Sequence, residues 1–146
     1  EHLNLTGVSN MINKKSGVFG ISQISSDMRD LATAAEAGNK KAILALQMYA
    51  YKVKKFIGSY IAAMNGVDII VFTGGIGEND YRMRKRICSD MENLGILFDD
   101  EVNYGSSGKD IVISKPESKV TVIAVTTDEE LVIASDTRTI VEHQTV

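Results

Sequence analysis

The chain has 146 residues, of which 44% are hydrophobic and 24% charged, and its formal net charge is −3. This length suits one domain, 1–146, with a sizeable core, and the charge gives no general attraction to nucleic acids or to anionic lipid. No apolar run approaches the roughly 20 residues that a membrane-spanning helix needs, and the start lacks a secretion signal. We therefore expect a cytoplasmic protein whose partners are neither nucleic acids nor membranes.

Helical periodicity dominates the first half of the chain. Residues 3–15 place apolar side chains on one face of a short helix, and a loop follows. A second helix is expected to start after a cap at Ser25 or Ser26 and to end near Gly38. The longest periodic segment, 39–64, predicts one long helix.

The second half alternates short apolar runs with polar turns. Residues 67–72 form a β-branched run that is typical of a strand covered on both faces. The runs 111–113 and 120–125 predict two further strands, and 95–98 a shorter one. The last element, from 127 to about 141, has helical periodicity. Helices and apolar strands interleave, so the sequence predicts an α/β fold.

The most informative motif is the glycine turn, residues 72–79, which reads Phe-Thr-Gly-Gly-Ile-Gly-Glu-Asn. Gly74 and Gly75 remove side chains where the first strand stops, and this lets a planar or charged ligand approach the main chain. A helix expected to begin near Asn79 would point its free N–H groups toward the same crevice, where open α/β sheets usually bind nucleotides. Neither the P-loop nor the dinucleotide pattern fits, since Asp80 stands where the latter needs glycine. A purely structural turn remains an equal alternative.

A second polar cluster, Thr127-Asp128-Glu129-Glu130, follows the apolar run 120–125 and opens the last helix. Thr127 and Glu130 have the spacing of a capping box, which accounts for two of these residues. Asp128 and Glu129 remain, and carboxylates at a strand end that faces a nucleotide crevice could hold Mg²⁺, directly or through water. Both interpretations stay open at this point.

Other polar features have simpler explanations. The segment 103–109 looks like a phosphate loop, but no helix follows it, so a surface turn within the polar connection 99–107 explains it. Cys88 is the only cysteine and has helical neighbours, so we expect it to pack as a small apolar side chain. His2 and His143 lack partners at ligand spacing and are not expected to bind a metal.

Four separated segments point to a known family. They are residues 13–17 (Asn-Lys-Lys-Ser-Gly), 26–29 (Ser-Asp-Met-Arg), 72–79 and 127–131 (Thr-Asp-Glu-Glu-Leu). In this order they resemble the C-terminal part of the acetate kinase family, and the resemblance covers nearly the whole chain. It implies the actin, sugar kinase and Hsp70 (ribonuclease H-like) fold. It also implies that the intact enzyme transfers a phosphoryl group from ATP to acetate, giving acetyl phosphate and ADP.

The same resemblance implies roles for single residues. The glycine turn would contact the nucleotide, residues 27–29 would border the adenosine, and Glu129 would be the acidic residue associated with Mg²⁺. By name, the implied nucleotide-binding residues are Asp27, Met28, Arg29, Gly75, Ile76, Gly77, Glu78 and Asn79. The resemblance also implies a homodimer whose interface lies in this half of the enzyme.

The chain departs from the family in two respects. The family often has Pro-Thr-Asn-Glu-Glu at residues 126–130, so Asp128 adds a potential negative charge beside the metal position. The family's amino-terminal Asn-x-Gly-Ser-Ser-Ser-x-Lys segment and its catalytic arginines, histidine and aspartate lie upstream of anything present here. We therefore assign no catalytic residue to this chain.

These departures set the functional expectation. We expect a piece of an acetate kinase, without initiator methionine, that binds nucleotide weakly and does not turn over alone. Two alternatives remain: a non-catalytic dimerisation or interaction module built on the long helix, and another acyl or sugar kinase of the same superfamily. The residues do not distinguish acetate from propionate.

Overall fold

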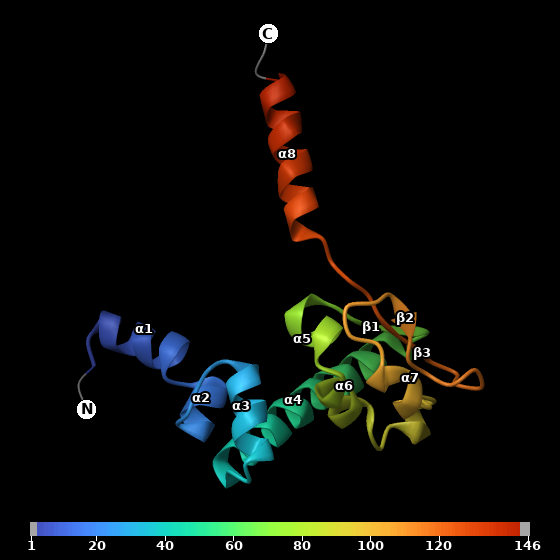
Figure 1. Cartoon of the computed structure of the whole chain (residues 1–146), viewed down its shortest axis with the longest axis horizontal. Helices are drawn as coiled ribbons and strands as arrows, with labels where there is room; N and C mark the ends of the chain where they lie inside the picture. Colours follow the sequence, from blue (N-terminus) through green and yellow to red (C-terminus); the bar gives the residue numbers. More distant parts are fainter. Residues whose placement is uncertain (1–2, 144–146) are drawn as a thin grey trace.

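The computed structural model describes residues 3–143, and Figure 1 shows how its elements are arranged. In chain order the helices are α1 Leu5–Lys14, α2 Gly17–Ser22, α3 Met28–Glu36, α4 Lys40–Met64, α5 Gly74–Asn79, α6 Tyr81–Cys88, the 3-10 helix η1 Glu92–Leu94, α7 Asp100–Tyr104 and α8 Glu129–His143. The strands are β1 Ile69–Phe72, β2 Ile111–Val112 and β3 Thr121–Ala124. Helices and strands interleave along the chain, which confirms the predicted α/β class.

The strands form one small sheet in the order β1-β3-β2. β1 and β3 are parallel and pair Phe72 with Ala124 at their carboxyl ends, whereas β2 runs antiparallel to β3. Since the carboxyl ends of β1 and β3 meet, the glycine turn after β1 and the segment after β3 leave the sheet at the same edge. This edge is where ligands of open α/β sheets bind.

The long helix α4 was predicted correctly. The side chain of Asn39 accepts hydrogen bonds from the backbone N–H groups of Lys41 and Ala42, at 3.0 and 3.2 Å, and so begins the helix. Asn65 ends it in the left-handed conformation with φ of +59°. Between these caps α4 packs against α2, α3 and α6.

The core is one cluster of side chains from α3, α4, α6, the sheet and the connections between them. Its buried apolar side chains include Leu31, Leu46, Met83, Ile87, Ile96, Ile113 and Val122. Each buried side chain of this size contributes roughly 1.5–3 kcal/mol relative to exposure. Cys88 is only 2% exposed within this core, and burial raises the pKa of its thiol to about 12. The cysteine is therefore a packed side chain and not a reactive thiol, as predicted.

Two expectations at the start of the chain were wrong. The loop expected after the first helix contains α2, which is too short to show a periodic pattern. The cap of α3 is Asp27, whose carboxylate accepts from the backbone N–H of Arg29 at 2.8 Å. Ser25 instead accepts from the backbone N–H of Asp27 and donates to Asp30, so it braces the cap without being one.

Three expectations in the second half also need correction. The polar connection 99–107 contains α7, and residues 95–98 form no strand beyond one isolated bridge between Phe98 and Ser114. β1 is not covered on both faces: Ile69 and Val71 are 53% and 52% exposed. Side chains alternate along a strand, and in β1 only the alternate pair Ile70 and Phe72 faces the core.

The terminal helices extend away from the sheet and α4 in Figure 1. α8 has the predicted position, but none of its side chains is buried, and Leu131, Ile133 and Ile140 are 64%, 66% and 56% exposed. α1 has no buried residue either. Within residues 3–143, we find no helix that combines the length and apolarity required to span a membrane.

Candidate functional site

The glycine turn folds as the short helix α5, which follows β1 directly. Gly74 has φ of +69°, a conformation that glycine adopts without strain. A Cβ atom placed on Gly74 or on Gly75 would meet no other atom within 4 Å. The main chain therefore borders open space at the end of β1, as a surface that receives a ligand requires.

The helix expected near Asn79 is a separate element, α6, which starts at Tyr81. Its first turn is capped by Asp80, whose carboxylate accepts from the backbone N–H of Met83 at 2.9 Å. The expected helix terminus is therefore engaged by the protein's own carboxylate. The helix that begins at the strand end is α5.

Gly77 is glycine for another reason. A Cβ atom on it would lie 3.0 Å from the backbone carbonyl carbon of Phe72, closer than side chains normally approach a main chain. The absence of a side chain therefore lets α5 fold back against the end of β1.

The carboxylate of Glu78 links the glycine turn to the segment after β3. Its Oε1 accepts from the hydroxyl of Thr127 at 2.6 Å and from the backbone N–H groups of Thr127 and Gly74, both at 2.9 Å. These hydrogen bonds, above all that of the Thr127 hydroxyl, lower the pKa of Glu78. The two segments that leave the same sheet edge are thus tied together.

The predicted capping box at the start of α8 is absent. The Thr127 hydroxyl donates to Glu78, and the carboxylate of Asp128 accepts from the backbone N–H of Leu131 at 2.9 Å. Asp128 therefore caps α8, because Thr127 makes a charge-assisted hydrogen bond to a carboxylate instead.

A cleft of about 780 Å³, which we call the α3–α5 cleft, separates α3 from the junction of α5 and α6. Its lining comprises Ser26, Asp27, Met28, Arg29, Ala32, Thr33 and Glu36 on one side and Gly75, Ile76, Asn79, Asp80, Tyr81 and Arg82 on the other. Six of the eight predicted nucleotide residues therefore meet in one cleft. The other two do not line it: Gly77 packs on β1, and the carboxylate of Glu78 faces Thr127.

Charged pairs frame the α3–α5 cleft. Arg29 contacts the carboxylate of Asp27 at 2.6 Å, and its hydrogen bonds lower the pKa of that carboxyl to about 2. Arg82 of α6 pairs with Glu36 of α3 at 3.0 Å, so an ion pair joins the two sides. The cleft thus offers the Asp27 carboxylate, which accepts from N–H groups of Arg29, together with exposed main chain and apolar contacts at Ile76, a set of groups that suits a nucleoside.

Glu129 lies in the first turn of α8, exposed to solvent and outside the α3–α5 cleft. No group of three or more His, Cys, Asp or Glu side chains gathers as a metal site among residues 3–143. Mg²⁺ usually keeps several waters and binds through one or two carboxylates and substrate phosphates, so a single carboxylate fits this ion. His143 bonds the carbonyl of Thr139, and His2 lies outside the described residues.

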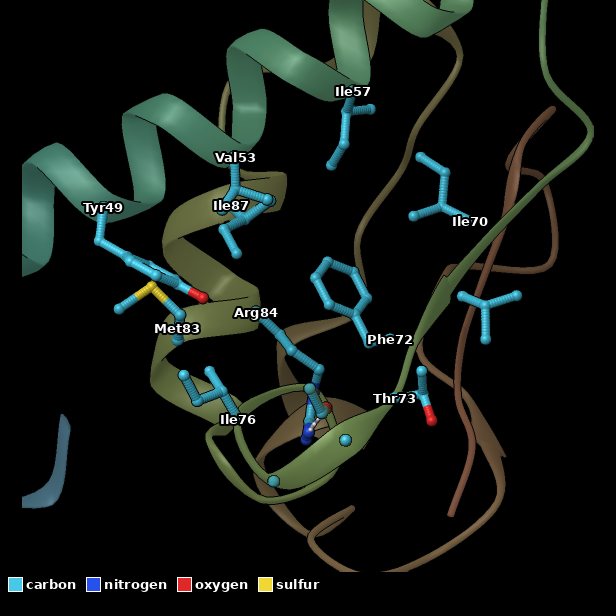
Figure 2. A pocket seen from close by; sticks show the side chains of 14 residues that line it. Tyr49, Val53, Ile57, Ile70, Phe72, Thr73, Ile76, Met83, Arg84 and Ile87 are labelled. Atoms are coloured by element: carbon cyan, nitrogen blue, oxygen red, sulfur yellow. Dashed lines mark hydrogen bonds between the residues drawn. The ribbon is translucent and has the colours of Figure 1, made fainter. Parts of the chain in front are cut away.

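A second cavity, of about 560 Å³, lies on the other side of the glycine turn, and Figure 2 shows it from close by. Tyr49 and Val53 of α4, Phe72 of β1 and Ile87 of α6 are among the mostly apolar side chains that line it. Gly75 and Ile76 border both cavities, so α5 forms the wall between them. Sequence reasoning did not predict this cavity.

Sequence reasoning also missed the residues behind α5. Arg84 is fully buried, and in the segment 103–109, expected as a surface turn, Asn103 and Ser106 are 1% and 0% exposed. One signal was available: Arg84 falls within the apolar face of α6, beside Ile87 and Cys88.

Comparison with known proteins gives consistent matches. A sequence profile of the Acetokinase family matches residues 1–135. The acetate kinase of Porphyromonas gingivalis is 59% identical over 142 residues, which are 97% of this chain and 36% of that protein. The crystal structure of Porphyromonas gingivalis acetate kinase matches with a TM-score of 0.87 and 59% identity, over 95% of this chain and 35% of that one. A propionate kinase from Francisella tularensis matches with a TM-score of 0.79 and 39% identity, over 90% and 33%.

Proposed function

We propose, because the chain belongs to the acetokinase family, that it is the C-terminal, nucleotide-binding portion of a longer acetate kinase. The chain spans about a third of the length of the relatives it matches. In the intact cytoplasmic enzyme the reaction would be phosphoryl transfer from ATP to acetate. The observation that carries the proposal is the α3–α5 cleft. Two predicted motifs that are far apart in the sequence, residues 26–29 and the glycine turn, line opposite sides of it.

The lining of the cleft suggests how it receives a nucleotide. The carboxylate of Asp27 is ionised at neutral pH, and beside its hydrogen bonds from Arg29 its two oxygens keep acceptor capacity for ribose hydroxyls. The exposed main chain of Gly75 and the side chain of Ile76 form the opposite side, close to the end of β1. Binding would therefore depend on orientation by backbone and packing, which is the main contribution of protein to phosphoryl transfer.

Mg²⁺ would be held by Glu129 together with the phosphates and water. Asp128 is engaged as the cap of α8 and Glu78 in its bonds to Thr127, so Glu129 and Glu130 are the available carboxylates of that cluster, and the family resemblance implies Glu129. A divalent ion bound there would neutralise charge on the phosphates. Because Glu78 fixes Thr127, the first turn of α8 stays at the edge of the sheet where the nucleotide site lies.

Titration of the chain with ATP in the presence of Mg²⁺ tests the proposal. We expect saturable but weak binding by isothermal titration calorimetry, and no acetyl phosphate, since this chain carries none of the family's charge-stabilising arginines. Heats of dilution alone would contradict the nucleotide site. Acetyl phosphate formation above a no-protein control would contradict the assignment of this chain as a non-catalytic portion.

One observation favours the alternative of a dimerisation module. The outer face of α4 exposes aromatic side chains, with Tyr51, Phe56 and Tyr60 at 63%, 52% and 61%, and the rings of Phe56 and Tyr60 stack at 6.5 Å. A stable dimer by light scattering without saturable ATP binding would favour the module. A dimer that also binds ATP would fit the homodimeric kinase.

Acetate and propionate as acceptors are distinguished by assaying the intact enzyme with each.

A further inference from the structure

The guanidinium of Arg84 lies directly behind the glycine turn. The side chain starts on α6, is 0% exposed, and reaches back to the end of α5. Its Nη1 donates to the carbonyl oxygens of Gly77 and Glu78, at 2.6 and 2.8 Å. Its Nε donates to Asn103 Oδ1 at 2.9 Å and its Nη2 to Ser106 Oγ at 2.5 Å. Arg84 also borders the cavity of Figure 2 and is absent from the lining of the α3–α5 cleft.

These four hydrogen bonds go to neutral acceptors. Burial lowers the pKa of Arg84 while nearby Asp80 raises it, and an arginine of this kind remains protonated at neutral pH. A buried cation is costly unless it is well hydrogen-bonded. The carbonyls of Gly77 and Glu78 suit it, because the last carbonyls of a helix lack partners within the helix and carry partial negative charge.

A second layer holds the partners of Arg84 in place. Asn103 Nδ2 donates to the carbonyl of Tyr81 at 2.9 Å, and Ser106 Oγ donates to the carbonyl of Asn103 at 2.5 Å. Ser107 Oγ donates to the carbonyl of Asn79 at 3.0 Å. The loop after α7 therefore contacts the end of α5 directly through Ser107 and indirectly through Ser106 and Arg84. A six-residue helix is marginal on its own, so its place depends on such contacts.

We propose that Arg84 is a positioning residue for nucleotide binding. It fixes the carboxyl end of α5, and α5 in turn presents Gly75 and Ile76 to the α3–α5 cleft. This inference rests on the proposed function, but it makes a separate statement: Arg84 acts without touching the nucleotide. We expect Arg84→Lys to weaken ATP affinity about tenfold, because one ammonium group does not reproduce the fork that reaches two carbonyls, Asn103 and Ser106 together.

The test measures ATP affinity, thermal midpoint and backbone order in the same chain. Mg·ATP affinity is measured by calorimetry, and hydrogen exchange of the α5 amides by NMR without ATP. Arg84→Lys is compared with Ile96→Ala, a core variant whose buried side chain does not line the α3–α5 cleft. We expect both variants to lower the thermal midpoint. Only Arg84→Lys should accelerate exchange at Ile76 to Asp80 and weaken ATP binding, with Ile96→Ala staying within about twofold of the unchanged chain.

The milder variant Ser106→Ala keeps the test decisive if Arg84→Lys does not fold. It removes one acceptor of Arg84, and we expect a smaller change of the same kind in α5 exchange and in ATP affinity. Unchanged exchange and affinity in Ser106→Ala and in any folded Arg84→Lys overturn the inference, as does an equal loss of affinity in Ile96→Ala. Absence of ATP binding by the unchanged chain overturns the proposed function instead. Exchange in α5 still reports on Arg84 in that case.

Discussion

At the residue scale, the three glycines of the turn serve different physical purposes. Gly74 needs its positive φ, Gly75 stands at open space, and Gly77 lies against the main chain of Phe72. The sequence alone does not separate these roles, because they depend on what lies around each glycine in the folded chain. Substitution by alanine therefore distinguishes them.

Gly75→Ala should weaken ATP binding without destabilising the fold. The added methyl group meets no protein atom within 4 Å, and Gly75 lines the α3–α5 cleft that we assign to the nucleotide. Calorimetric titration with Mg·ATP and thermal unfolding measure the two effects. Gly58→Ala is the matched control, since a Cβ there also meets no atom within 4 Å but the residue lies on α4, outside the cleft. Equal ATP affinity in both variants contradicts the prediction.

Gly77→Ala, in contrast to Gly75→Ala, should destabilise the fold. Its Cβ would lie 3.0 Å from a backbone atom of Phe72, and such overpacking costs about 1–3 kcal/mol, more than the gain of up to about 1 kcal/mol in helix propensity. Urea unfolding should therefore show a lower free energy of unfolding for Gly77→Ala than for Gly75→Ala. Equal stability of the two variants would show that α5 moves away from β1 without cost.

The pKa of Asp27 makes the start of α3 sensitive to acid. Hydrogen bonds from Arg29 lower this pKa from 3.8 to about 2. A carboxyl whose pKa is lower in the folded chain stabilises the fold above its unfolded pKa, and this contribution is lost as pH falls from about 4 to about 2. Carboxyl carbon shifts in an NMR titration should place the midpoint of Asp27 near 2. A midpoint near 4, or the same acid sensitivity in Asp27→Asn, contradicts this.

At the scale of the elements, predictability followed length. α4 could be predicted because its periodicity runs over many turns between two good caps, Asn39 and Asn65. α2, α5 and α7 have five or six residues, fewer than a periodic pattern needs, and all three were missed. The sequence showed that a polar motif follows each of β1 and β3. It did not show that these two motifs contact each other. The bond from Thr127 to Glu78 joins residues 49 positions apart and depends on the parallel pairing of these strands.

That contact between elements gives a prediction of its own. Thr127→Val keeps the size of the side chain and the backbone N–H but removes the hydroxyl, which is the main cause of the lowered pKa of Glu78. The pKa of Glu78 should rise in this variant, and the first turn of α8 should become more mobile relative to the glycine turn. An NMR titration of the Glu78 carboxyl and amide exchange at the start of α8 measure both effects. Thr137→Val, which removes a hydroxyl within α8, is the control.

At the scale of the whole molecule, the residues that line the α3–α5 cleft were more predictable than the residues that support α5 from behind. Ordered motifs brought six of the implied nucleotide residues to one cleft, because motifs at the carboxyl end of β1 and at the cap of α3 are local features. Arg84, Asn103 and Ser106 were not predictable as a group, since their contact depends on how α7 packs behind α6. Local sequence motifs therefore predict the residues that line a cleft more readily than the buried residues that hold its walls in place.

The exposed apolar side chains of α8 allow a test of whether this chain is a portion of a larger enzyme. Ile133 and Ile140 lie about two turns apart on the same side of α8 and are 66% and 56% exposed, so replacing both with serine should change the free energy of unfolding of this chain by no more than about 0.5 kcal/mol. In the intact kinase that we propose, the rest of the polypeptide would cover this face, and the same pair should lower stability by about 1.5–3 kcal/mol for each side chain that it buries. Denaturant unfolding of both proteins measures the difference, with the exposed Ser135→Ala as control. Equal, small effects in the two proteins would mean that α8 remains uncovered in the intact kinase, which contradicts this prediction.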